Sequence, residues 1–138
     1  MTQITERLFI GEKGDQPFSR FTALLNLAPD LFVLLYEKIE YASVGLIDGP
    51  GNKTCMIVAA VSVLHQLLER HPSVVLICHG GTGRSGLVAS LYLAVRHDIK
   101  WEHALQLVKN KRPQADPNGE LIKCVPVVIP LLQKLFKE

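Results

Sequence analysis

A cysteine and an arginine enclose a short glycine-rich segment near the middle of the chain. Cys78 opens this segment and Arg84 closes it, with five residues between them. A cysteine thiolate is a strong nucleophile, and the planar guanidinium of arginine can bind two oxygens of one phosphate group. The pair therefore predicts in-line attack on a phosphoryl group, through a cysteinyl-phosphate intermediate.

Three glycines lie between these two residues: Gly80, Gly81 and Gly83. Glycine adopts positive φ without steric cost, so we expect successive backbone N–H groups to point into one concavity. Amide dipoles and a guanidinium lower the pKa of a thiol from about 8.5 to roughly 3.5–7.5. The sequence thus predicts that residues 78–84, the phosphate loop, bind an anion beside an easily ionised Cys78.

The flanking residues predict that the phosphate loop joins a strand to a helix. Val74–Ile77 is a short apolar run typical of a buried strand, and Leu87–His97 is almost wholly apolar, which indicates a buried helix. The first amides of a helix lack intrahelical partners, and the helix dipole adds partial positive charge at that end. This order of elements favours an anion site at the loop.

The segment Cys78-x-Gly-Gly-x-Gly-Arg84-Ser85-Gly86 resembles the signature loop of the cysteine-dependent protein tyrosine phosphatases, in their small dual-specificity branch. The resemblance implies a hydrolase that removes phosphate from tyrosine, or from serine and threonine as well, without a metal or other cofactor. It also implies that Ser85 hydrogen-bonds the cysteine sulfur and stabilises the departing thiolate. The residues expected to bind substrate are His79, Gly80, Gly81, Thr82, Gly83 and Arg84.

One position departs from the family pattern. The family usually has a histidine directly before the cysteine, and here that residue is Ile77. The histidine helps to hold the loop and to tune the thiol, so we expect Cys78 to be less acidic than in relatives. His79 is open to three interpretations: a partial substitute, a substrate contact, or a solvated loop residue.

A phosphate ester needs a proton donor for its leaving oxygen, so a carboxylic acid must face the loop. Asp48 lies thirty residues before Cys78, in a turn after a predicted strand. The carboxyl ends of parallel strands meet at one edge of a sheet, and Asp48-Gly49 resembles the general-acid loop of the family. Asp-Gly also forms turns for local reasons. Asp30 and Asp116 are the alternative acids.

Two residue pairs near the end of the chain resemble a supporting segment of the family. Arg112-Pro113 and Pro117-Asn118 match its Arg-Pro and Pro-Asn pairs, whose asparagine supports the phosphate loop. Asn118 is therefore expected to act as a support. Arg112 is either a charge at a helix end or a residue of the site.

Alternation of strands and helices predicts an α/β fold, with a central, mainly parallel sheet of four to five strands and helices on both faces. Asn52 is expected to cap one helix, and Pro126 and Pro130 predict that the final apolar stretch forms two short helices or one kinked helix. The predicted strands are Leu8–Gly11, Phe21–Leu27, Tyr41–Ile47 and Val74–Ile77, and the predicted helical segments are Leu31–Glu40, 53–70, Leu87–His97, Trp101–Lys111 and Leu121–Phe136.

Composition limits the remaining possibilities. A chain of 138 residues is expected to form one catalytic domain, residues 1–138, acting as a monomer. A net charge of +2 gives no reason to expect nucleic-acid binding, and no apolar run reaches the roughly 18 residues that span a bilayer. Three cysteines suit a reducing cytoplasm, with Cys55 and Cys124 expected in the core. The scattered histidines indicate no metal site.

Two other functions remain open. The same chemistry would serve a phosphoinositide or RNA 5′-phosphatase, although lipid phosphatases of this type tend to have lysines in the loop, where this chain has His79 and Thr82. A phosphate-binding module with weak or no turnover is the second alternative, to which Ile77 gives some weight.

Overall fold

The computed structural model describes residues 1–34, 38–80 and 82–137. Five strands form one sheet in the order β1-β2-β5-β3-β4. Strand β1 runs antiparallel to β2, and the other neighbouring pairs are parallel. The predicted α/β class with a mainly parallel sheet is thereby confirmed. The strands are β1 (Thr2–Gln3), β2 (Leu8–Gly11), β3 (Ala23–Asn26), β4 (Glu40–Ser43) and β5 (Val74–Ile77).

The register of the parallel strands brings their carboxyl ends to one edge. Ile77, the last residue of β5, is level with Gly11 of β2 and with Asn26 of β3. Asn26 in turn is level with Ser43 of β4. The segments that leave the sheet after β3, β4 and β5 therefore start side by side, and Cys78 is the first residue beyond β5.

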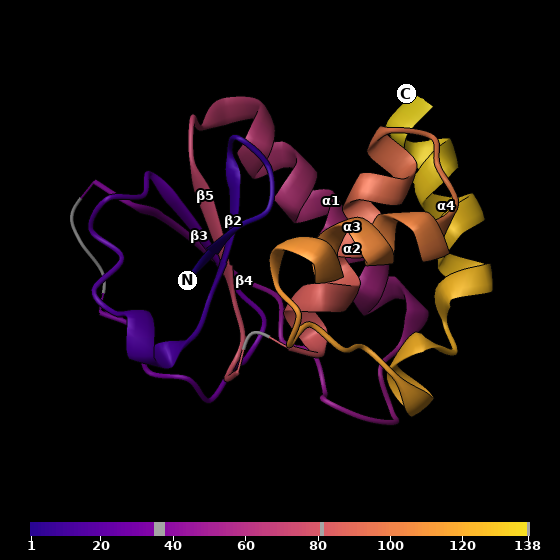
Figure 1. The fold of residues 1–138 in the computed structure, drawn as a ribbon, viewed down its shortest axis with the longest axis horizontal. Coiled ribbons are helices and arrows are strands. Elements are labelled where there is room, and N and C mark those ends of the chain that lie inside the picture. The colour runs from indigo at the N-terminus through magenta and orange to yellow at the C-terminus, as the bar shows by residue number, and fades with distance from the viewer. Residues whose placement is uncertain (35–37, 81, 138) are drawn as a thin grey trace.

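The four α-helices lie on one face of the sheet (Figure 1). The core there combines strand residues such as Leu25 and Leu76 with buried residues of every α-helix. The helices are α1 (Thr54–Arg70), α2 (Arg84–Arg96), α3 (Trp101–Lys111) and α4 (Val125–Lys137), and two short 3₁₀ helices are η1 (Lys13–Asp15) and η2 (Gly119–Ile122). No α-helix in the described residues is long and apolar enough to cross a membrane.

The second face of the sheet differs from the prediction, because loops cover it instead of α-helices. Strand side chains alternate between faces, so Leu24, Val75 and Ile77 point away from the main core. They pack with Phe18 and Phe21 in a separate apolar cluster. The helix predicted over Leu31–Glu40 is wrong for its described part, where 31–34 and 39 are irregular, 38 is a turn and 40 begins β4; residues 35–37 lie outside the described residues.

Two local predictions, the Asn52 cap and a buried Cys55, are wrong, whereas the predicted division of the last apolar stretch is observed. Lys53, without a side-chain capping bond, is the N-cap of α1, because the amide of Asn52 bonds the backbone of Ile47 instead. Cys55 is exposed in the first turn of α1, whereas Cys124 is half-buried against the core. Burial raises the pKa of the Cys124 thiol. The last apolar stretch consists of η2 followed by α4, which contains Pro130.

Candidate active site

The phosphate loop connects β5 to α2 as the sequence predicts. Cys78 is buried directly after the strand, and Arg84 is the first residue of α2 and is also buried. His79, Gly80, Thr82 and Gly83 lie between them, while Gly81 is outside the described residues. A nucleophile and a guanidinium therefore stand at the end of a strand and at the amino-terminal end of a helix.

Two polar atoms at the start of α2 are buried without a hydrogen-bond partner. Arg84 donates Nη1 to the carbonyl oxygen of Leu46 at 3.1 Å, but its Nε has no partner in the described structure. The Oγ of Ser85 has none either, so the predicted hydrogen bond from Ser85 to the Cys78 sulfur is not made. Buried polar groups in proteins are nearly always paired, so these two atoms are suited to a ligand.

The carbonyl groups of the loop are held from outside by the segment after α3. Arg112 donates Nη2 to the Gly80 oxygen at 3.2 Å, and the Asp116 amide donates to the Thr82 oxygen at 3.1 Å. Arg112 is buried and also donates Nη1 to Thr2 Oγ1 at 2.7 Å. Two carbonyl groups of the loop are therefore fixed by hydrogen bonds from the segment after α3.

Asn118 and Arg112 are connected to the phosphate loop in different ways. Asn118 donates its amide to Asp116 Oδ2 at 2.9 Å, and the backbone amide of Asp116 donates to the Thr82 oxygen, so Asn118 is linked to the loop through Asp116. Arg112 bonds the loop directly, so of its two predicted roles, a charge at a helix end or a residue of the site, the structure favours the second. The Arg112-Pro113 pair was the one indication of this role.

Replacing Arg112 with leucine is expected to lower the free energy of unfolding by about 2–3 kcal/mol, because the Gly80 carbonyl and the Thr2 hydroxyl lose a buried donor. Urea unfolding followed by circular dichroism measures this. The neighbouring Lys111→Leu is the matched control, since Lys111 is exposed, and should change stability by no more than about 0.5 kcal/mol. Equal losses in the two variants would contradict the supporting role.

The structure brings Asp48 against the loop. A Cβ atom added to Gly83 would lie 2.8 Å from Asp48 Oδ1, closer than any side chain tolerates. A side chain at position 83 would therefore displace the Asp48 carboxylate from its place beside the loop, and the Gly83 φ of −80° is ordinary. The sequence had attributed the loop glycines to positive φ, and Gly80 also lies outside that region.

Asparagine holds the turn that carries Asp48. Asn52 accepts from the Ile47 amide at 2.8 Å and donates to the Ile47 carbonyl at 2.6 Å. Gly51 has a φ of 104°, which a residue with a side chain rarely adopts. These two hydrogen bonds close the turn into a small ring, so the backbone that carries the Asp48 carboxylate has a defined conformation.

The two alternative acids are engaged elsewhere. Asp30 Oδ1 accepts from His79 Nε2 at 2.9 Å, and this hydrogen bond is the main cause that lowers the pKa of the Asp30 carboxyl. Asp116 accepts from Asn118 and lies 3.7 Å from Lys109 Nζ. A lowered pKa makes Asp30 a poorer proton donor, and the Asp116 side chain is held by Asn118 and lies near Lys109, whereas Asp48 lies against the loop at Gly83.

Ile77 occupies the place of the histidine usual in the resembling family. Its side chain is fully buried in the apolar cluster on the second face, with Phe18 and Val75. Cys78, one residue later, belongs to the main core on the helix side. Position 77 therefore supplies no imidazole to the loop, and the histidine of the described loop residues is His79.

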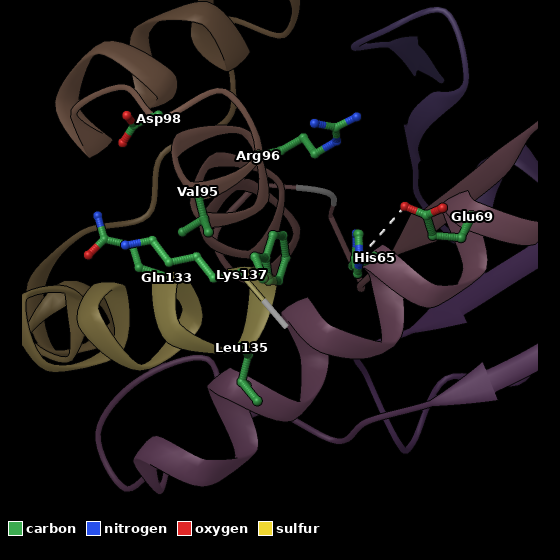
Figure 2. Close-up of a pocket in the computed structure, with 9 residues that line it drawn as sticks. His65, Glu69, Val95, Arg96, Asp98, Gln133, Leu135 and Lys137 are labelled. Atoms are coloured by element: carbon green, nitrogen blue, oxygen red, sulfur yellow. Dashed lines mark ion pairs between the residues drawn. The ribbon is translucent and has the colours of Figure 1, made fainter.

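A cavity of about 620 Å³ lies apart from the loop, between α1, α2 and α4 (Figure 2). The His65 ring stacks on Phe136 there with centroids 4.4 Å apart, and His65 Nε2 lies 3.7 Å from Glu69 Oε1. Figure 2 shows Arg96 extending toward the right of the view and Leu135 extending downward, so these two lining side chains do not converge on one point. The candidate site is therefore placed at the loop, where Cys78, Arg84 and Asp48 lie.

Comparison with known proteins gives one consistent set of relatives. No family model matches the chain. Human dual specificity protein phosphatase 18 is 26% identical over 126 residues, which cover 86% of this chain and 67% of that protein. Human dual specificity protein phosphatase 14 is also 26% identical over 126 residues, covering 86% of this chain and 63% of that protein.

Solved structures share the fold. Human DUSP28 superposes with a TM-score of 0.85 at 18% identity, covering 98% of this chain and 99% of that chain. A mouse putative dual specificity phosphatase complexed with zinc tungstate gives a TM-score of 0.86 at 20% identity, covering 98% of this chain and 89% of that chain. The comparisons confirm both the fold class and the resemblance to the small dual-specificity branch.

Proposed function

We propose that this chain is a protein phosphatase of the small dual-specificity branch, which it resembles, and that it hydrolyses phosphate monoesters on protein side chains, with residues 1–138 as its catalytic domain. The observation that carries the proposal is the buried Cys78 at the end of β5, followed by two buried unpaired atoms, Arg84 Nε and Ser85 Oγ. A tetrahedral anion seated in the loop would satisfy such groups. The curated relatives are named dual specificity protein phosphatases.

In the first step, Cys78 Sγ attacks phosphorus and a sulfur–phosphorus bond forms. Arg84 and the loop amides bind the equatorial oxygens, whose charge is spread in the transition state. The bond from phosphorus to the side-chain oxygen breaks, and Asp48 gives its proton to that oxygen. The dephosphorylated side chain leaves as a neutral hydroxyl.

In the second step, water hydrolyses the cysteinyl phosphate. The Asp48 carboxylate takes a proton from water as oxygen bonds to phosphorus and the sulfur–phosphorus bond breaks. The Ser85 hydroxyl is within the first turn of α2 and is proposed to donate to the departing thiolate. Inorganic phosphate is released and Cys78 is restored.

A side-by-side assay tests the proposal. The purified chain is expected to release phosphate from p-nitrophenyl phosphate and from phosphopeptides. It should be much less active on inositol phospholipids and on triphosphorylated RNA at equal concentration. Preferred turnover of either of the last two would show a phosphatase with a different substrate. Phosphopeptide binding without phosphate release between pH 5 and 7 would instead favour a phosphate-binding module.

A further inference from the structure

We propose that Asn52 is a positioning residue of the reaction, because it fixes the turn from which Asp48 reaches the phosphate loop. It thereby determines where the general acid delivers its proton. This role rests on the proposed function, since it concerns the acid of the same site. Its basis is a set of hydrogen bonds from Asn52 to the backbone on both sides of Asp48.

The position of the Asp48 carboxylate depends on its backbone. Asp48 is exposed, and its side chain has no hydrogen bond or ion pair among the residues that the structure describes. Its Oδ1 nevertheless lies so close to Gly83 that a Cβ atom added there would be 2.8 Å away. Because no partner holds the side chain, the conformation of residues 47–49 decides where the carboxylate lies.

The turn that carries the acid cannot supply this rigidity from its own sequence. It contains Gly49 and Gly51, and glycine is the residue with the greatest backbone freedom. Only the start of the segment is anchored to the core: Leu46 is buried, its amide donates to the Leu27 oxygen at 2.9 Å, and its carbonyl accepts from Arg84 Nη1 at 3.1 Å. The chain beyond Leu46 therefore needs a second anchor.

Asn52 provides the second anchor. Its Oδ1 accepts from the Ile47 amide at 2.8 Å, and its Nδ2 donates to the Ile47 carbonyl at 2.6 Å and to the Gly49 carbonyl at 3.5 Å. One side chain thus bonds the residue before Asp48 and the residue after it. Asn52 itself lies two residues before Thr54, the start of α1, which is fixed by its buried side chains in the main core.

Loss of these hydrogen bonds should misplace the proton donor without removing it. A displacement of about 1 Å in an active site can lower a rate by about a hundredfold. Asn52→Ala is therefore expected to lower kcat/KM for a phosphopeptide by about 10- to 50-fold. The loss for p-nitrophenyl phosphate should be no more than about threefold, because p-nitrophenolate leaves without protonation. A purely structural defect would lower both values equally.

The double variant Asp48→Asn/Asn52→Ala separates positioning from a general effect. If Asn52 acts through Asp48, its loss should matter little once the acid is gone. The double variant is then no more than about twofold slower on the phosphopeptide than Asp48→Asn alone. The matched control is Asn110→Ala, at an exposed asparagine of α3 that bonds only Gln106, and it should keep wild-type kinetics within about twofold.

Equal losses on the two substrates in Asn52→Ala, or losses that multiply in the double variant, would overturn the positioning role. It would also be overturned if the wild type is active but Asp48→Asn shows no dependence on the leaving group, and the phosphatase activity itself would then stand. A wild type that hydrolyses neither substrate would instead contradict the proposed function.

In that last case the anchor is tested without turnover, by the hydrogen exchange of the Ile47 amide measured by NMR. This amide donates to Asn52 Oδ1, so its exchange should be slow in the wild type and faster by at least about tenfold in Asn52→Ala. Slow exchange that is lost in the variant would support the anchor, and equal exchange in the two proteins would overturn it.

Discussion

Cys78→Ser is expected to lower hydrolysis of p-nitrophenyl phosphate to below about one thousandth of the wild-type rate, because the variant lacks the atom that forms the covalent intermediate. A serine hydroxyl fits the same buried position after β5 but is a far weaker nucleophile at neutral pH. The variant should keep its fold and still bind phosphopeptide. Steady-state kinetics and the circular dichroism spectrum measure both properties.

The other two cysteines provide controls for this prediction. Cys55 is exposed and Cys124 is half-buried, and neither belongs to the loop. Cys55→Ser and Cys124→Ser should retain wild-type kcat/KM within about threefold, since neither side chain touches the reacting atoms. An active Cys78→Ser variant, or loss of activity in Cys55→Ser, would contradict the assignment of the nucleophile.

Asp48→Asn is expected to lower kcat for a phosphopeptide by about 100- to 1,000-fold, the range typical of a lost general acid. The asparagine keeps the shape of the carboxylate that lies against Gly83 but has no proton to give. The loss should be smaller for p-nitrophenyl phosphate, because p-nitrophenolate leaves readily without protonation. The ratio of the two losses is the measurement that identifies a proton donor.

The corresponding variants of the other two carboxylates test the choice among acids. Asp30 is held by His79, and Asp116 contacts Asn118 and Lys109. Neither Asp30→Asn nor Asp116→Asn should show a loss that depends on the leaving group. If either did, and Asp48→Asn did not, the general acid would have to be reassigned to that residue.

Local pattern was enough to predict the framework of the site. The apolar run Val74–Ile77 and the helical periodicity of 53–70 identified β5 and α1, and their boundaries differ from the prediction by at most one residue. Position relative to strand ends then brought Asp48 near the loop. These features depend on periodicity and on parallel order, which a single sequence carries.

Contacts between distant segments could not be predicted in the same way. The sequence attributed Gly83 to backbone freedom, but a side chain there would meet the carboxylate of Asp48, which lies thirty-five residues away in the sequence. The loop around Leu31 has apolar residues at spacings that suit a helix. In the structure Leu31 and Val33 pack against the second apolar cluster from an irregular segment. Tertiary packing decided both cases.

The guanidinium of Arg112 links two segments that lie far apart in the sequence. It bonds the hydroxyl of Thr2, in the edge strand, and the carbonyl of Gly80 at the same time. One side chain therefore joins strand β1 to the phosphate loop. A change in β1 that displaces Thr2 would remove a hydrogen-bond partner of the same guanidinium that holds Gly80, although the two residues lie far apart in the sequence.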